Sequence, residues 1–421
     1  MTVLIKQATI VNSSSPFNGL VKDILIENGQ IVSIVDNSSS SADQVIESEG
    51  LHVSMGWLDS FAHFCDPGYE FRETLETGSR AAAAGGFTDV MLVPNSNPVV
   101  HAKTQVEYLK QRSQNLPVNL HVIAAVTRNA EGKELAEMYD MFEAGATAFS
   151  DGTNAIQNGG LLLKALQYVK AINGIVIQVP GDKSIGASGL MNEGVISTQL
   201  GLPGKPAMAE ELMVTRDIEL NNYTNSRIHF SSISTAKSLD HIRAAKAGGG
   251  QVSCAVTPYH LYFSDEDLQQ YDTNLKVDPP VRTPFDRNAL KAGLLDGTID
   301  CFATHHIPQN YDAKVCEFEY ARDGMIGLES FFGAVWSLFK NDLPLDKLID
   351  LLTVQPRRLF GIAAAEIKEG VQASLTLFDP SATYVFEEKN IQSKSKNSAF
   401  TGKTLTGKVI GIVNGNHVHL N

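Results

Sequence analysis

A carboxylate, an aromatic ring and an imidazole stand at every second position of one short apolar stretch, residues 57–64. If this stretch is a β-strand, Asp59, Phe61 and His63 share one face, because successive side chains of a strand point to opposite faces. A Pro-Gly turn follows and predicts the end of the strand. A metal-dependent hydrolase would have two imidazoles on such a face, whereas phenylalanine has no lone pair to offer. The pattern therefore indicates a metal-binding strand that lacks one ligand.

Other polar side chains follow apolar runs farther along the chain. Asn95 could donate a hydrogen bond to a bound amide or carboxylate, or it could form a turn. Asp151 could bind a metal ion or cap the next helix. His305 follows the last apolar run, where a lone histidine is more often a hydrogen-bonded polar residue than a metal ligand. The residues alone leave these alternatives open.

Apolar runs and helix-like segments alternate from about residue 55 to residue 368. Helical patterns rich in Ala, Glu and Leu lie between the runs, for example at residues 132–144 and 238–247. Alternation over this length predicts an α/β fold, a (β/α)8 TIM barrel with a parallel sheet. In such barrels the chemistry lies at the C-terminal ends of the strands. The predicted strands are residues 57–64, 89–93, 121–126, 146–149, 174–177, 228–230, 251–256 and 299–303.

Both ends of the chain have the alternation of β-strands. Within residues 1–54, alternating apolar segments are separated by turn signals such as Glu27-Asn28-Gly29. Residues 373–378 and 408–413 follow the same pattern. We therefore predict one small β-sandwich domain formed by residues 1–54 and 369–421. The barrel domain is predicted to span residues 55–368.

Composition excludes several classes of function. The chain has 421 residues and a formal net charge of −13, and with no basic run to offset that charge we expect no binding to nucleic acid. The N-terminus lacks the layout of a signal peptide and no apolar run could span a bilayer, so we expect a cytoplasmic protein without a membrane partner. No CxxC pair occurs, so neither a zinc knuckle nor a disulfide framework is predicted from Cys65, Cys254, Cys301 and Cys316.

A series of short motifs runs in a set order along nearly the whole chain. They are Gly56-Trp57-Leu58-Asp59 with His63, residues 78–88, Pro94-Asn95, residues 191–194, Arg216-Asp217-Ile218, residues 274–282, residues 297–300, Gly327-Leu328-Glu329 and residues 397–400. Together they resemble the dihydroorotases, in the type I branch of the cyclic amidohydrolase superfamily. The resemblance implies a metal-dependent TIM barrel with a small β-sandwich formed by both termini. It also implies a role in pyrimidine biosynthesis, with dihydroorotate as the cyclic amide that is hydrolysed.

The chain departs from this family at the metal centre. The resemblance implies a metal centre bound by a set of histidines and a bridging acid. Of these metal ligands, only His63 and Asp151 remain in this chain. The lost ligand positions are Phe61, Val179 and Ser232. The arginine that holds the substrate carboxylate falls on Cys65, and the aspartate that serves as general base falls on His305.

Coordination chemistry gives these losses a consequence. A catalytic zinc ion normally has about three protein ligands and an open position for water. Two remaining ligands are too few, so we interpret the centre as dismantled and expect no cofactor. The alternative is a rearranged zinc site formed by His63, Asp151 and His305, a set of two histidines and one carboxylate that can work when the three converge.

Two classes of function follow from the resemblance. Some relatives of dihydroorotase lack the metal ligands and are non-catalytic partners of aspartate carbamoyltransferase, and this chain is similar to them in its losses. The resemblance thus implies an inactive structural or regulatory partner of that enzyme, and a homo-oligomer such as a dimer. The alternative is an active zinc-dependent cyclic amidohydrolase with the rearranged site. A third hypothesis is that the former enzyme pocket binds a small ligand at the vestigial substrate positions Asn95, Asn274 and His260.

Overall fold

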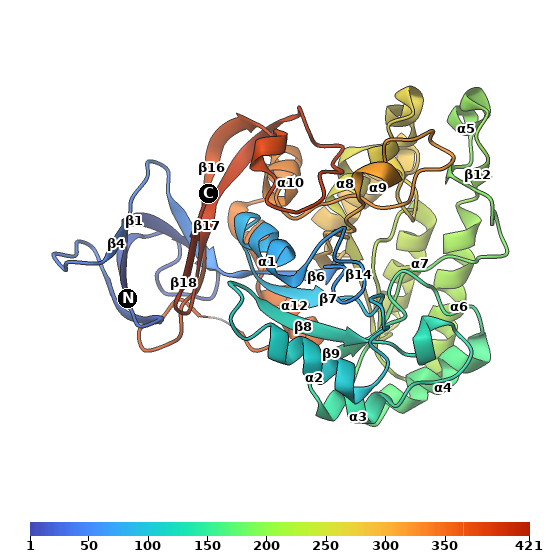
Figure 1. Ribbon diagram of the computed structural model, residues 1–421, viewed down its shortest axis with the longest axis horizontal. Coiled ribbons are helices and arrows are strands. Elements are labelled where there is room, and N and C mark those ends of the chain that lie inside the picture. The colour runs from blue at the N-terminus through green and yellow to red at the C-terminus, as the bar shows by residue number, and fades with distance from the viewer. Residues whose placement is uncertain (365) are drawn as a thin grey trace.

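Eight short apolar segments form the parallel strands of a barrel (Figure 1). The computed structural model describes residues 1–364 and 366–421. Every residue of the first two barrel strands is buried, as expected of parallel strands that are covered on both faces. The α/β fold class with a (β/α)8 barrel is therefore confirmed. The barrel strands are β6 (Trp57–Ala62), β7 (Phe87–Leu92), β8 (Asn119–Ala124), β9 (Ala146–Phe149), β10 (Val176–Gln178), β13 (Ile228–Phe230), β14 (Val252–Val256) and β15 (Cys301–Phe302).

Contacts between the first and the last strand close the barrel. Ala62 at the end of β6 forms a parallel bridge with His306, just beyond β15. The N–H of His63 donates to the carbonyl oxygen of His306 over 2.9 Å. The carboxylate of Asp59 accepts hydrogen bonds from the Thr304 N–H at 2.7 Å and from the Thr304 hydroxyl at 2.6 Å. The first residue of the predicted metal-binding face thus has a structural role.

Helices separate the strands and pack their apolar sides against the sheet. In α4 the buried residues recur three or four positions apart, as on one apolar helix face: Leu162, Ala165, Leu166 and Val169. Among the described residues, no helix is both long and apolar enough to cross a membrane. The helices of the barrel region are α1 (Leu75–Ala84), α2 (Lys103–Arg112), α3 (Met138–Glu143), α4 (Gly159–Lys170), α5 (Val195–Leu200), α6 (Met208–Thr224), α7 (Ala236–Ala247), α8 (Pro258–Tyr262), α9 (Pro284–Leu295), α10 (Phe331–Phe339), α11 (Leu345–Asp350) and α12 (Val354–Phe360).

The helix predicted over residues 132–144 is much shorter in the structure, where only α3 is helical. Before α3 the chain folds back, with a bridge between Thr127 and Leu135 and a hydrogen bond from the Arg128 N–H to the Glu134 carbonyl at 2.9 Å. Gly132 has a φ of +68°, which lies outside the helical region. The helix prediction was wrong here because the glycine turn and these contacts compete with helix formation.

Strands from both ends of the chain form a second sheet with its own apolar core. In Figure 1 the blue N-terminal strands and the red C-terminal strands lie side by side, next to the barrel. The two groups meet where β5 pairs with β1 in parallel and with β16 in antiparallel orientation. The predicted domain boundaries themselves stay a prediction. The strands are β1 (Thr2–Val11), β2 (Val21–Glu27), β3 (Gln30–Val35), β4 (Gln44–Ile46), β5 (His52–Met55), β16 (Ser374–Val385), β17 (Thr404–Asn414) and β18 (His417–Leu420).

A cluster of buried apolar side chains runs through the barrel strands and includes two of the predicted site positions. Phe61 of β6 and Val179, which follows β10, belong to this cluster. Other members are Leu58, Met91, Ile123, Ile177, Ala255 and Ala303. Side chains at two expected ligand positions therefore contribute to the apolar core of the protein.

Candidate site at the C-terminal end of the barrel

The ring of Phe61 stacks on the imidazole of His305. The ring centroids are 4.1 Å apart and the planes differ by 10°, a contact that follows from the closure of the barrel between β6 and the end of β15. Nε2 of His305 lies 3.0 Å from the hydroxyl oxygen of Ser231. Burial lowers the pKa of His305 to about 3, so its imidazole is neutral at physiological pH. The histidine at the general-base position is therefore a packed, uncharged ring.

Both ring nitrogens of His63 form hydrogen bonds within the protein. Nδ1 accepts from the N–H of Cys65 at 2.8 Å, and Nε2 donates to the carbonyl oxygen of Asn95 at 3.0 Å. Burial lowers the pKa of His63 to about 4, which keeps the ring neutral. A neutral imidazole has one N–H and one lone pair, and here both are used. His63 consequently offers no free lone pair to a metal ion in this arrangement.

Cys65 replaces the expected arginine with a buried thiol. Its side chain is 2% exposed, and its backbone has a φ of +60°. Burial raises the pKa of the thiol to about 12, so the group is uncharged. A neutral thiol has neither the charge nor the paired donors with which arginine binds a carboxylate. The residue cannot hold the carboxylate of a substrate in the way the family does.

Asp151 is turned toward a neighbouring threonine. Its Oδ1 accepts from the N–H of Thr127 at 2.9 Å and its Oδ2 from the Thr127 hydroxyl at 2.5 Å. The same hydroxyl accepts from the N–H of Gly132 at 2.9 Å, so the turn before α3 is part of this arrangement. Burial raises the pKa of Asp151, while the two bonds from Thr127 act in the opposite direction. The acid at the bridging position therefore anchors a loop.

Asn95 connects the two remaining ligand positions through hydrogen bonds. Its Nδ2 donates to the carbonyl oxygen of Asp151 at 3.0 Å, and its Oδ1 accepts from the N–H of Thr153 at 3.2 Å. Since its own carbonyl accepts from His63, the residue is bonded to both segments. The amide that could have served a substrate thus holds the ends of β7 and β9 in place.

The two other predicted binding residues, His260 and Asn274, differ in whether their side chains form hydrogen bonds within the protein. Nδ1 of His260 accepts from the Thr257 hydroxyl at 2.9 Å, and Nε2 donates to the Pro279 carbonyl at 3.0 Å. Burial lowers the pKa of His260 to about 4. Asn274 is half-buried in the short turn Thr273–Leu275, and among the described residues its side-chain amide has no hydrogen-bond partner. His260 is committed to its loop, whereas Asn274 keeps a polar group available.

The lost ligand positions are closed to solvent. Phe61 and Ser232 are 0% exposed, and Val179 is 7% exposed. Ser232 follows the serine that contacts His305 and has a φ of +60°. Because protein interiors are densely packed, side chains of this kind leave little room for an ion and its water.

The donors at this end of the barrel do not fit a zinc ion. Within residues 1–364 and 366–421, no three His, Cys, Asp or Glu side chains are placed to hold one. His63 and Asp151 are directed at protein partners, and His305 contacts Ser231 through Nε2, while its Nδ1 is buried without a hydrogen-bond partner among the described residues. Zinc would require their donor atoms within about 2.0–2.2 Å of one point.

A buried group of two acids and a histidine near this end was missed by sequence reasoning. Nε2 of His306 lies 3.5 Å from Oε2 of Glu73, and both side chains are fully buried. Glu73 also accepts from the N–H of Lys394 at 3.1 Å. A second buried acid, Glu329, accepts from the N–H of Ser393 at 2.8 Å. The family motifs included Glu329, but only the folded chain shows that these acids hold the segment before β17 against the barrel.

Comparisons with known proteins agree with the motifs. Residues 52–238 match the family model described as Dihydro-orotase-like. The chain is 40% identical over 412 residues to a dihydroorotase of Pelotomaculum thermopropionicum, covering 97% of this chain and 96% of the relative. It is 38% identical over 414 residues to a dihydroorotase of Syntrophus aciditrophicus, covering 97% of both chains.

Solved structures with lower sequence identity share the fold. The L-hydantoinase (dihydropyrimidinase) of Arthrobacter aurescens superimposes with a TM-score of 0.86 at 22% identity, over 99% of this chain and 95% of that one. The dihydropyrimidinase of Brevibacillus agri superimposes with a TM-score of 0.84 at 18% identity, over 100% and 95%. Such identities speak for the fold alone, whereas the full-length relatives establish the family. The chain belongs to the dihydroorotase family of cyclic amidohydrolases.

Proposed function

We propose that this member of the dihydroorotase family has lost hydrolytic activity. In this proposal the chain acts in the cytoplasm as a structural or regulatory partner of aspartate carbamoyltransferase, binds no zinc, and forms a homo-oligomer such as a dimer. The observation that supports it most directly is the stack of Phe61 on His305, at two positions where the family has a ligand and a base. Without an ion, amide hydrolysis lacks both an activated water and a polarised carbonyl.

The hydrogen bonds of the remaining polar groups support the same proposal. His63, Asp151 and His260 form bonds that hold loops at the barrel mouth. A partner protein that recognises the outside of the barrel needs those loops to be ordered, and it does not need a reactive pocket. Loss of the ligands is therefore compatible with retention of the fold.

Co-elution tests the proposed partnership. The purified chain is mixed at micromolar concentration with the aspartate carbamoyltransferase of the same organism and separated by size exclusion with light scattering. We expect one complex that is larger than either protein, and each protein run alone is the control. Separate migration of the two proteins would remove the partnership from the proposal and leave the question of activity untouched.

The second candidate is an active zinc-dependent dihydroorotase, which the similarity to full-length relatives named dihydroorotase favours. Elemental analysis after purification without chelators distinguishes the two candidates. The proposal expects well under one zinc per chain and no turnover of dihydroorotate above background. Near-stoichiometric zinc together with enzyme-like turnover would establish the active alternative.

A further inference from the structure

A large cavity formed by the described residues lies at the opposite end of the barrel from the site above. It has a volume of about 970 Å³ and is lined at the starts of the strands, by Asp89 of β7, Asn119 and His121 of β8, and Thr147 of β9. The terminal sheet contributes Gln372, Ser374 and Asn414 to its wall. A cavity of this size between two structural units is typical of sites for small molecules.

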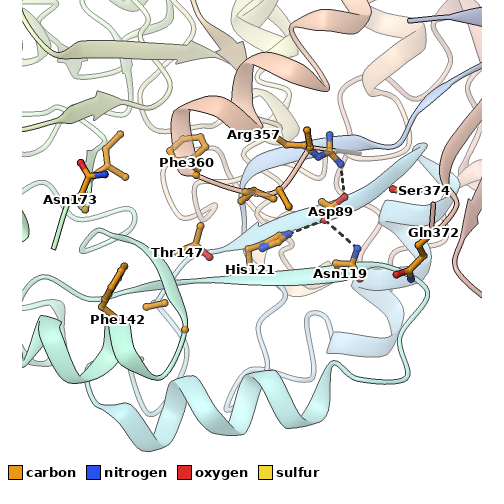
Figure 2. A pocket seen from close by; sticks show the side chains of 18 of the residues that line it. Asp89, Asn119, His121, Phe142, Thr147, Asn173, Arg357, Phe360, Gln372 and Ser374 are labelled. Carbon is orange, nitrogen blue, oxygen red and sulfur yellow. Dashed lines mark hydrogen bonds and ion pairs between the residues drawn. The ribbon is translucent and has the colours of Figure 1, made fainter. Parts of the chain in front are cut away.

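One wall of the cavity is a fixed ionic group centred on Asp89 (Figure 2). Its Oδ1 accepts from Nε2 of His121 at 2.8 Å and from Nδ2 of Asn119 at 3.2 Å, while its Oδ2 accepts from Nη2 of Arg357 at 2.6 Å. These donors lower the pKa of Asp89 to about 2 against the effect of burial. Arg357 pairs with the carboxylate and offsets its negative charge.

The bonds to Asp89 determine what the neighbouring side chains present to the cavity. His121 donates from Nε2 to Asp89, and among the described residues its Nδ1 has no hydrogen-bond partner. Asn119 uses its amide nitrogen, which leaves its Oδ1 as an acceptor. The hydroxyl of Thr147 has no hydrogen-bond partner in the described part of the chain either. Figure 2 shows all three side chains in the same cavity.

The rest of the lining supplies a donor and apolar surfaces. Arg227 lines the cavity and directs two of its nitrogens at the carbonyls of Asn173 and Leu359, which leaves further N–H groups. Lys368 and Glu366 lie 3.5 Å apart and balance each other's charge. Apolar walls come from Phe142, Ile172, Phe360 and Ile362. The lining therefore combines acceptors and apolar faces with the guanidinium of Arg227, which contacts backbone carbonyls and forms no ion pair among the described residues.

We propose that this cavity binds a small uncharged molecule of the ureide or imide class, in which ring N–H donors alternate with carbonyl acceptors. The N–H groups of such a ring suit Oδ1 of Asn119 and the hydroxyl of Thr147, its carbonyls suit Arg227, and the unpartnered edge of His121 offers a further polar contact. Uracil and its nucleoside uridine represent the class and are small enough for the volume. The site is separate from the strand ends where the family has its metal centre, and it does not depend on the proposed loss of activity.

Calorimetric titration of the full chain tests this site, with uracil and uridine as probes and inorganic phosphate as the charged control. We expect uracil or uridine to bind with a dissociation constant below about 1 mM, and phosphate not to bind. His121→Ala should weaken binding at least about tenfold, whereas His417→Ala, a matched change of an exposed histidine on β18, should leave it unchanged.

Thr147→Val keeps the test decisive if His121→Ala does not fold. It removes a hydroxyl without a protein partner and preserves the shape of the side chain, so the fold should persist while uracil binding weakens severalfold. Circular dichroism checks the fold of each variant. The proposal is overturned if neither uracil nor uridine binds at about 10 mM, if phosphate binds in their place, or if binding is the same in the folded cavity variants as in the parent chain.

Discussion

The polar side chains at the two ends of the barrel differ in their hydrogen bonds and in their surroundings. At the C-terminal end, the imidazoles of His63 and His260 have both nitrogens bonded within the protein, and a phenylalanine covers His305. At the N-terminal end, Asp89 orients His121 and Asn119 but leaves Nδ1 of the one and Oδ1 of the other without a partner among the described residues, in the lining of a cavity. The end that carries chemistry in this fold is a packed interior, where even unpartnered atoms such as Nδ1 of His305 are buried, whereas the end usually associated with stability has its unpartnered polar atoms in the lining of a cavity. The residue types alone therefore do not show which end of the barrel is able to bind a ligand.

Truncation of Phe61 should give the largest effect, because it empties part of the packed end. We expect Phe61→Ala to lower the free energy of unfolding by roughly 3–5 kcal/mol, measured by urea denaturation. Phe61→Leu retains most of the volume and should cost about 1 kcal/mol. Equal stability of the alanine variant and the parent chain would show that this end is not packed as described.

Removal of Arg357 tests the ionic group at the other end. Arg357→Met leaves the buried carboxylate of Asp89 without its cation, so stability should fall by about 3 kcal/mol. The double variant with Asp89→Asn should recover part of that loss, since the unpaired charge is gone. A double variant less stable than the single one would contradict this account of the group.

Acid should weaken the same group over a defined range of pH. The pKa of Asp89 is about 2 in the folded chain and about 3.9 when unfolded, so only the unfolded chain binds this proton between those values. Its contribution to stability is present above about pH 4 and is lost as the pH falls toward 2, a change of about 2 kcal/mol. Denaturation at several pH values should show a smaller loss for Asp89→Asn. Parallel curves for the two proteins would argue against the lowered pKa.

Thiol labelling should show the smallest effect and reports on the packed end without any mutation. Cys65, Cys254 and Cys301 are buried, and the pKa of Cys65 is about 12, so iodoacetamide at neutral pH should reach only Cys316 in the folded chain. Mass spectrometry should find at most one adduct before and four after unfolding. Rapid labelling of Cys65 in the folded chain would mean that the mouth of the barrel is open.

The barrel could be predicted from the sequence because buried parallel strands appear as continuous apolar runs. The runs at residues 146–149 and 228–230 coincide with β9 and β13. The segment at residues 132–144 could not be predicted, since its helical composition is overridden by Thr127, whose hydroxyl binds both Asp151 and the N–H of Gly132. Contacts of this kind join residues from different strands and leave no local signal.

The candidate site was predictable only in its residue types. Motif positions identified Phe61, Cys65, Val179, Ser232 and His305 as departures from the family, and the structure buries all five. The partners of His63 and Asp151 were not predictable, because the Asn95 carbonyl and Thr127 come from other strands. The cavity at the N-terminal end was missed altogether, since its lining is assembled from many separate segments.

The sheet shared by the two ends of the chain has a consequence for the order of folding. Strand β5 needs β16 as its antiparallel neighbour, and more than three hundred residues of barrel separate the two in the chain. During synthesis, which proceeds from the N-terminus, one edge of β5 therefore stays without its partner until the last strands have left the ribosome. An unpaired edge is a surface on which chains aggregate. Slow synthesis or a pause near the C-terminus would therefore lower the yield of soluble protein, because the edge of β5 stays exposed for longer.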